Sequence, residues 1–144
     1  MNRQPVSQQG YTLLEVMIVV VIVGVIAAIA IPSYTGHLVD TRRTAAQASL
    51  LELANAIEQH RSQLGSYNGI DAGGGVPVVA IFPADKVNTD FYSLRITQSN
   101  ATSYTLQATP VAGSPQAGDG SLRLLSTGER LWDKAGDNSF SASW

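Results

Sequence analysis

The sequence predicts an α+β fold in which one long N-terminal helix, over about residues 11–63, packs on a four-stranded antiparallel β-sheet meander. Three features of the chain predict it. An uncharged apolar run lies near the start, apolar residues at helical spacing follow it, and the second half alternates between apolar and polar residues. A recurrence every three to four residues indicates a helix with one buried face, and strict alternation indicates half-buried strands.

The first part of the helix is apolar on all sides. Val16–Ile31 contains no polar side chain, and no Asp, Glu, Lys or Arg lies between Glu15 and Asp40. A helix rises about 1.5 Å per residue, so roughly 20 residues cross the hydrocarbon core of a bilayer. The run is therefore long enough to span a membrane. It begins with a carboxylate, which is costly in hydrocarbon and usually has a function.

The second part of the helix is amphipathic. Pro32 lacks a backbone N–H and disfavours helix at the residue before it, so we expect a kink there. Beyond it, apolar residues recur at helical spacing at Ala46, Leu50, Leu53, Ile57 and Leu64. One face of this half is therefore expected to meet a core, and Gly65 is a typical helix stop. The whole helix would be about 80 Å long.

The sheet is predicted from alternation. Tyr92, Leu94 and Ile96 share one side of a first strand, and Tyr104, Leu106 and Ala108 share one side of a second. A hairpin at Ser99–Ala101 joins them, and two more strands are expected around Ser121–Leu125 and Glu129–Trp132. Ser66–Asp90 is expected to be irregular. Its glycines, Gly73–Gly75, are not followed by the Lys-Ser/Thr of a phosphate-binding loop, so they predict a flexible loop.

Composition excludes several classes of function. The 144 residues suffice for one modest domain. Without residues 1–10, eight basic residues stand against eleven acidic ones, which does not indicate DNA binding. The absence of cysteine excludes disulfides, thiolate zinc sites and thiol nucleophiles. His37 and His60 lie far apart on one helix, and no catalytic or EF-hand spacing is present, so we expect no enzyme activity, no cofactor and no metal site.

A specific motif precedes the apolar run. Gln9–Met17 places Gly10 before an aromatic residue, Tyr11, with Glu15 at a fixed offset from them. The segment resembles the prepilin cleavage motif of type IV pilins and pseudopilins, in which Phe is commoner at the position of Tyr11. The rest of the chain resembles the sheet of PilE-type minor pilins more loosely, at Tyr104–Pro110, Leu122–Leu124 and Gly128–Arg130.

The resemblance implies a pilin fold with three parts: a leader peptide at 1–10, a transmembrane or filament-core half of the helix at 11–39, and a globular head at 40–144. A prepilin peptidase would cut between Gly10 and Tyr11 and methylate the new amine of Tyr11. The alternative is an uncleaved signal anchor.

The resemblance also assigns roles within the helix. Glu15 would pair with the N-terminal amine of a neighbouring subunit as filaments assemble. The alternative for this side chain is that it only reaches the membrane interface. Gly24 and Pro32 match positions between which the helix tends to lose helicity in the filaments of relatives.

The cysteine-free C-terminus departs from many relatives, which close a C-terminal loop with two cysteines. Asp119 and Ser143 occupy those places here. The loop Lys134–Ser143 is therefore expected to be held by packing of Phe140 and Trp144, or to be mobile. Cysteines at both places are expected to form a disulfide.

We therefore expect a structural subunit of a type IV pilus, more specifically a minor pilin, which contributes to pilus assembly, twitching motility, adhesion or DNA uptake. The implied partners are other pilin subunits, prepilin peptidase, the inner-membrane assembly platform and, before assembly, membrane lipid. The expected location is the bacterial inner membrane, single-pass with a periplasmic head, and later the extracellular filament. A type II secretion pseudopilin and a membrane-anchored binding or enzymatic head stay open as alternatives.

Overall fold

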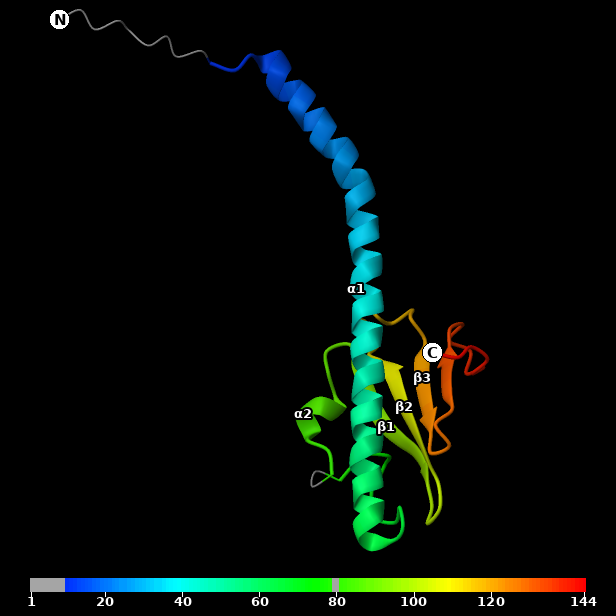
Figure 1. Cartoon of the computed structure of the whole chain (residues 1–144). Helices are drawn as coiled ribbons and strands as arrows, with labels where there is room; N and C mark the ends of the chain where they lie inside the picture. Colours follow the sequence, from blue (N-terminus) through cyan, green and yellow to red (C-terminus); the bar gives the residue numbers. More distant parts are fainter. Residues whose placement is uncertain (1–9, 79–80) are drawn as a thin grey trace, which may run out of the picture. The chain divides into compact units, whose positions relative to one another are not determined.

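The computed structural model describes residues 10–78 and 81–144. Within them, helix α1 spans Leu13–Leu64, helix α2 spans Ala84–Val87, and strands β1 to β4 span Tyr92–Ser99, Tyr104–Pro110, Ser121–Leu125 and Arg130–Asp133 (Figure 1). Neighbouring strands are antiparallel, in the order β1-β2-β3-β4. The predicted α+β class, with one long N-terminal helix and a four-stranded antiparallel meander, is confirmed.

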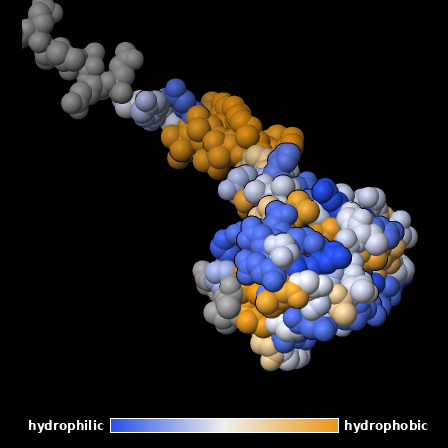
Figure 2. Space-filling model, turned by 60° about the horizontal axis from the view of Figure 1, so that its bottom comes forward, coloured by the Kyte–Doolittle hydropathy of each residue, from blue (hydrophilic) through white to orange (hydrophobic). Residues whose placement is uncertain are grey.

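The chain divides into two compact units that meet in sequence between His37 and Leu38. In the first unit, every large apolar side chain from Leu13 to Ile31 is more than half exposed. These side chains form the continuous hydrophobic band in Figure 2. By length and composition, this part of α1 is able to cross a membrane. The expected leader lies outside the described residues, except for Gly10.

Helix α1 continues through Pro32, where we expected a kink. A proline inside a helix removes one backbone hydrogen bond and crowds the preceding turn. The hydroxyl of Thr35 donates to the Pro32 carbonyl at 2.9 Å. The segment from Gly24 to Pro32 is helical throughout, so the loss of helicity expected in filaments stays a prediction about another state.

The second unit is built around the amphipathic half of α1. Four residues of this half are buried at helical spacing: Ala46, Leu50, Leu53 and Ile57. They share one core with the inward-facing side chains of the sheet and of the connecting segment, namely Tyr67, Ile70, Phe82, Val87, Tyr92, Leu94, Ile96, Tyr104, Leu106, Ala108, Leu122 and Leu124. Burial of one large apolar side chain stabilises a fold by about 1.5–3 kcal/mol, so this core holds the helix half on the sheet.

The hairpin between β1 and β2 turns later than predicted. Ser99 pairs with Tyr104, so the turn consists of Asn100–Ser103. The Asn100 side-chain carbonyl accepts the backbone N–H groups of Thr102 and Ser103, each at 2.9 Å. An asparagine that bonds the backbone two and three residues ahead favours such a turn.

The connection between α1 and β1 is more ordered than predicted. It contains α2 and a tight glycine turn, in which the Asp71 carboxylate accepts the N–H of Gly73 at 2.7 Å and of Gly75 at 3.3 Å. Gly75 has φ +78, and a Cβ there would lie 2.6 Å from the Ile96 carbonyl oxygen. The Ile96 N–H donates to the Gly75 carbonyl at 2.7 Å. The turn therefore covers part of the outer edge of β1.

The C-terminal loop is held on the sheet without a disulfide. The Asp133 carboxylate accepts the N–H groups of Gly136 and Asn138, both at 2.9 Å. Arg123 lies over the Phe140 ring at 3.6 Å from its centroid, and the Trp144 indole N–H donates to the Arg123 carbonyl at 3.2 Å. The expected packing by Phe140 and Trp144 is therefore present, with Asp133 as an additional anchor.

Candidate functional site

The start of α1 is fixed by a cap that we did not predict. The Thr12 hydroxyl accepts the backbone N–H of Glu15 at 3.2 Å, which is one half of a capping box. The Thr-x-x-Glu spacing in the sequence could have predicted this cap. Gly10 and Tyr11 precede the cap outside the helix, and Tyr11 is 85% exposed. The peptide bond between them is therefore on an accessible, non-helical segment.

Glu15 combines exposure with an apolar setting. It borders a shallow groove of about 290 Å³ that is lined by Tyr11, Val16, Val19 and Val20. Within residues 10–78 and 81–144, its carboxylate has no hydrogen bond and no ion pair. A carboxylate on an apolar helix needs a partner when the helix leaves water. The arrangement suits a cation supplied by another molecule.

Gly24 lies in the same apolar helix, about two and a half turns from Glu15. A Cβ at Gly24 would meet no atom within 4 Å, so no contact of this chain requires glycine there. Neither Gly24 nor Pro32 lines the Glu15 groove. No contact among the described residues explains why a glycine stands at position 24.

The head contains a buried polar cluster around Asp119. In the sequence, Asp119 is notable only as the residue at a position where many relatives have a cysteine. Arg43 donates to Asp119 Oδ2 from Nε at 2.8 Å and to Oδ1 from Nη2. The Tyr92 hydroxyl donates to Oδ2 at 2.5 Å, and the Gln116 amide nitrogen donates to it at 2.9 Å. The Gln116 amide also donates to the Val39 carbonyl at 2.9 Å. We call Arg43, Tyr92, Gln116 and Asp119 the Asp119 cluster.

Hydrogen bonds within the Asp119 cluster keep Asp119 and Arg43 ionised. Burial alone would raise the pKa of Asp119, but hydrogen bonds from Arg43, Tyr92 and Gln116 outweigh it and lower the pKa below its usual value. The hydrogen bond to Asp119 raises the pKa of Arg43. Burial, followed by the bond to Asp119, raises the pKa of Tyr92. Arg43 and Asp119 therefore stay ionised, and their ion pair holds the part of α1 that enters the head against the β2–β3 connection. The Tyr92 hydroxyl adds β1 to the same contact.

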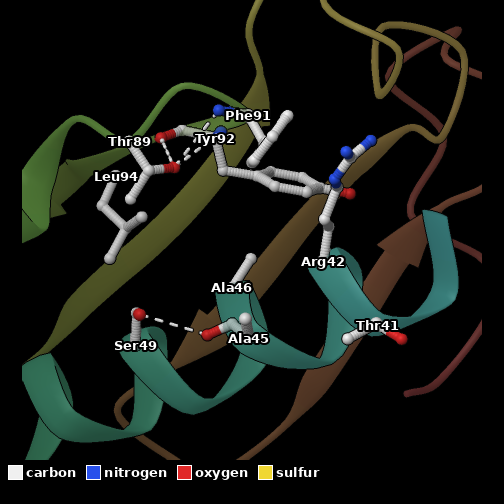
Figure 3. Close-up of a pocket in the computed structure, with 9 residues that line it drawn as sticks. All are labelled: Thr41, Arg42, Ala45, Ala46, Ser49, Thr89, Phe91, Tyr92 and Leu94. Carbon is white, nitrogen blue, oxygen red and sulfur yellow. Dashed lines mark hydrogen bonds between the residues drawn. The ribbon is translucent and has the colours of Figure 1, made fainter. Parts of the chain in front are cut away.

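An apolar groove of about 240 Å³ lies beside this cluster, between α1 and the start of β1 (Figure 3). Helix α1 contributes mainly small side chains to it, and the β1 side contributes larger ones; its lining is Thr41, Arg42, Ala45, Ala46, Ser49, Thr89, Phe91, Tyr92 and Leu94. The Arg42 guanidinium lies over the Phe91 ring at 3.9 Å from its centroid. The groove has room for an apolar side chain.

Most cations of the head lie over aromatic rings. Arg42, Arg130 and Lys134 lie over Phe91, Trp144 and Trp132 respectively. In the part of the chain that the structure describes, none of these three cations has a carboxylate within ion-pair distance. A ring holds a cation without neutralising its charge, so the three charges remain available to an anion. Among the same described residues, no group of three His, Asp or Glu side chains could hold a metal ion.

Two family models match the chain. The model described as "Type IV minor pilin ComP, DNA uptake sequence receptor" matches residues 32–122, which is more than half of the chain. The model described as "Prokaryotic N-terminal methylation motif" matches residues 6–31. The two matches are adjacent, since the first model begins at Pro32 and the second ends at Ile31.

Curated relatives match over part of the chain's length. A fimbrial protein of Pseudomonas aeruginosa is 46% identical over 52 residues, which are 36% of this chain and 34% of that protein. The type II secretion system core protein G of Escherichia coli is 35% identical over 55 residues, which are 38% of each chain. The chain thus spans about a third of the length of these relatives.

A solved structure shares the fold. The crystal structure of the non-core minor pilin PilV of Neisseria meningitidis matches with a TM-score of 0.55, at 16% identity, over 75% of this chain and 98% of that one. At this identity the likeness concerns the fold alone.

Proposed function

Because the chain belongs to the type IV minor pilin ComP family, we propose that it is a structural subunit that enters a type IV pilus through its apolar N-terminal helix. The observation that carries the proposal is the exposed carboxylate of Glu15, which has no partner among the described residues. It lies on the part of α1, from Leu13 to Ile31, whose large apolar side chains are all exposed. In a filament, neighbouring helices would cover these side chains, and the N-terminal amine of a neighbour would pair with Glu15.

The test is incorporation into filaments. Glu15→Ala should remove the subunit from sheared pili at unchanged cellular amounts, as measured by immunoblotting of both fractions. Truncating one partner of a buried ion pair costs about 3–5 kcal/mol. Asp90→Ala is the matched control, because Asp90 is exposed and has no ion pair among the described residues. Filaments that contain Glu15→Ala at wild-type amounts would refute the assembly role.

We further propose that a prepilin peptidase cuts between Gly10 and Tyr11 and methylates the amine of Tyr11. The match to the methylation motif and the accessible segment before the Thr12 cap support this. Gly10→Ala should leave the protein at its unprocessed size, whereas Gly24→Ala, which also meets no neighbouring atom, should be processed normally. Mass spectrometry of the mature N-terminus should find N-methyltyrosine. A Gly10→Ala protein of mature size would contradict the proposed cleavage.

Before assembly, the apolar helix would anchor the subunit in the inner membrane with its head in the periplasm. The assembly platform and membrane lipid are its proposed partners in this state. The similarity to type II secretion core protein G keeps a pseudopilus as a competing assembly. A deletion strain separates the two: loss of surface pili with normal exoprotein secretion supports a pilus, and the reverse supports a pseudopilus.

A second candidate function is DNA uptake, because the matched family is described as a DNA uptake sequence receptor. The charge balance of the whole chain does not indicate DNA binding, but Arg42, Arg130 and Lys134 retain charges that no described carboxylate pairs. Fluorescence anisotropy with a labelled duplex should then give an affinity that falls steeply as salt rises. Absence of binding at low salt would remove this candidate.

A further inference from the structure

The outer face of the sheet, which points away from the core, carries two arginines that flank one glutamine. Arg95 of β1 and Arg123 of β3 both pair in register with Gln107 of β2. Adjacent strands lie about 4.8 Å apart, so the two arginine side chains start roughly 10 Å apart. Nη2 of Arg123 donates to the side-chain oxygen of Gln107 at 3.1 Å. Its guanidinium therefore extends over the middle strand, on the side of Arg95.

Both arginines keep a donor without an acceptor. Nη1 of Arg95 and Nε of Arg123 are buried and have no hydrogen-bond partner in the described residues. Neither side chain has a carboxylate within ion-pair distance there. Buried polar groups nearly always have a partner, and an exception calls for an explanation such as a missing ligand. The two unpaired nitrogens are themselves covered by the protein, so an anionic acceptor from another molecule would reach the remaining nitrogens of these guanidinium groups, whose charges no described carboxylate pairs.

A depression of about 470 Å³ lies on this face and is lined by Thr97, Gln98, Thr105, Arg123, Leu125 and Leu131. The register of β1 against β2 shifts between Ile96 and Gln98. Such a bulge re-aims side chains, and here Thr97 and Gln98 both reach the depression. We call these six residues the outer-face depression. They offer hydroxyl, amide and guanidinium groups beside two leucine side chains, and no aromatic ring lines them.

We propose that the outer-face depression binds an acidic sugar, with Arg95 and Arg123 on its carboxylate. Guanidinium groups bind carboxylates through paired, charge-assisted hydrogen bonds. Thr97, Gln98 and Thr105 would bond the sugar hydroxyls, and the leucines would contact its C–H groups. The accessibility of this face rests on the proposed function, because a filament built on α1 turns the face opposite α1 outward.

The charge density of the face favours a sugar over DNA. Duplex DNA carries one charge per about 1.7 Å of helix axis, and single strands bind largely by stacking on rings. The outer-face depression offers Arg123 alone as a cation in its lining, with Arg95 next to it, and no ring. A uronic acid, with one carboxylate per sugar, matches this sparse charge.

An extended peptide fits less well. Peptides commonly bind a sheet by adding a strand to its edge. Here Gly75 accepts a hydrogen bond at the outer edge of β1, and Ala142 pairs with Trp132 at the outer edge of β4. Parts of both edges are therefore occupied by the chain itself, which leaves the face, not an edge, as the binding surface.

The test is titration calorimetry of the full chain in detergent micelles with digalacturonate. Arg95→Gln and Arg123→Gln should each weaken binding at least tenfold, and the fully methyl-esterified disaccharide should not bind. Arg130→Gln is the matched control, because Arg130 also lacks a described carboxylate partner but lines a different groove. It should change the affinity less than twofold.

Several outcomes would overturn the proposal: no binding of digalacturonate at millimolar concentration, equal binding by Arg95→Gln, or displacement of digalacturonate by a 12-base-pair duplex. The Arg95 side chain makes no hydrogen bond among the described residues, so Arg95→Gln tests the site even if Arg123→Gln disturbs the C-terminal loop that Phe140 holds on the sheet. Both variants should still enter sheared pili. Failure of the sugar site with normal incorporation would leave the proposed subunit function intact.

Discussion

Arg43 and Asp119 lie 76 positions apart in the chain and form the ion pair that joins α1 to the β2–β3 connection. The pair is largely enclosed, since the Asp119 side chain is 5% exposed and the Arg43 side chain is 20% exposed. The Arg43 guanidinium also lies over the Trp132 ring of β4, at 4.2 Å from its centroid. Arg43 therefore connects the helix both to the β2–β3 connection and to β4.

Asp119→Asn should lower the free energy of unfolding by about 2–4 kcal/mol. The amide cannot carry the charge that Arg43 and Tyr92 bond, and removal of one partner from an enclosed pair leaves the other charge uncompensated. Arg43 keeps Asp40 at 3.2 Å, which limits the loss. Urea unfolding of the full chain in micelles, followed by Trp132 fluorescence, measures it. Asp90→Asn should change stability by less than about 0.5 kcal/mol; equal losses for both variants would disprove the importance of the pair.

The same cluster predicts acid sensitivity. The pKa of Asp119 is lowered in the folded state, so its contribution to stability is present above the unfolded value of about 3.9 and is lost as the pH falls through the folded-state pKa. The wild type should lose stability below about pH 4, and Asp119→Asn should lose less over the same interval. Parallel pH profiles of unfolding for the two proteins would show that other carboxylates cause the loss.

Two glycines with similar backbone angles should respond very differently to alanine. Gly120 has φ +80, and a Cβ there would lie 1.8 Å from the Asp133 carbonyl oxygen, whereas Gly128 has φ +86 and an added Cβ meets no atom within 4 Å. Gly128→Ala should cost about 1 kcal/mol from the left-handed conformation alone. Gly120→Ala adds a backbone clash, for a total of about 2–4 kcal/mol. Melting curves that rank the two variants equally would mean that β4 can move away from Gly120.

Asp133→Ala should loosen the C-terminal loop without unfolding the head. Its carboxylate accepts two N–H groups at 2.9 Å, from Gly136 and Asn138. In the variant Asn138 loses this acceptor, and Gly136 keeps only the longer bond to the backbone carbonyl of residue 133, at 3.3 Å. Hydrogen exchange at these two amides should accelerate at least tenfold, while the amide of Ile96 in β1 should keep its protection. Unchanged exchange would indicate that the Phe140 and Trp144 contacts alone hold the loop.

A disulfide between cysteines at positions 119 and 143 should form but should bring little net stability. The Trp132 indole N–H donates to the Asp119 carbonyl at 2.8 Å, and Trp132 pairs with Ala142, next to Ser143. Closing a loop of this size contributes about 3 kcal/mol, which is similar to the loss of the Arg43 partner. Free thiols after expression in an oxidising periplasm would disprove the positional equivalence to the cysteines of relatives.

The elements that were predicted correctly depend on local patterns. Leu50, Leu53 and Ile57 repeat at the helical period and are buried, and the alternation at Tyr92–Ile96 and Tyr104–Ala108 reports which side of each strand faces the core. Such periodicity is visible within ten residues. The hairpin was placed too early because the Asn100 side chain, not the strand pattern, decides where the chain turns.

The Asp119 cluster could not be predicted, because its members come from α1, β1 and the β2–β3 connection. No spacing in the sequence relates Arg43 to Asp119. The glycine turn is a similar case. Gly73–Gly75 indicates a loop, but its order depends on the carboxylate of Asp71 and on the N–H of the distant Ile96. Glu15, by contrast, was recognised from its motif, and its lack of a partner within the described residues required the structure.

The partly occupied sheet edges affect how neighbouring heads in a polymer can contact one another. Gly75 bonds Ile96 at the outer edge of β1, and Ala142 bonds Trp132 at that of β4. The parts of both edges that are occupied in this way disfavour pairing between the sheets of neighbouring heads, so contacts through side chains are favoured. A subunit at the end of such a polymer would therefore be held by side-chain contacts and not by a continuous ladder of backbone hydrogen bonds.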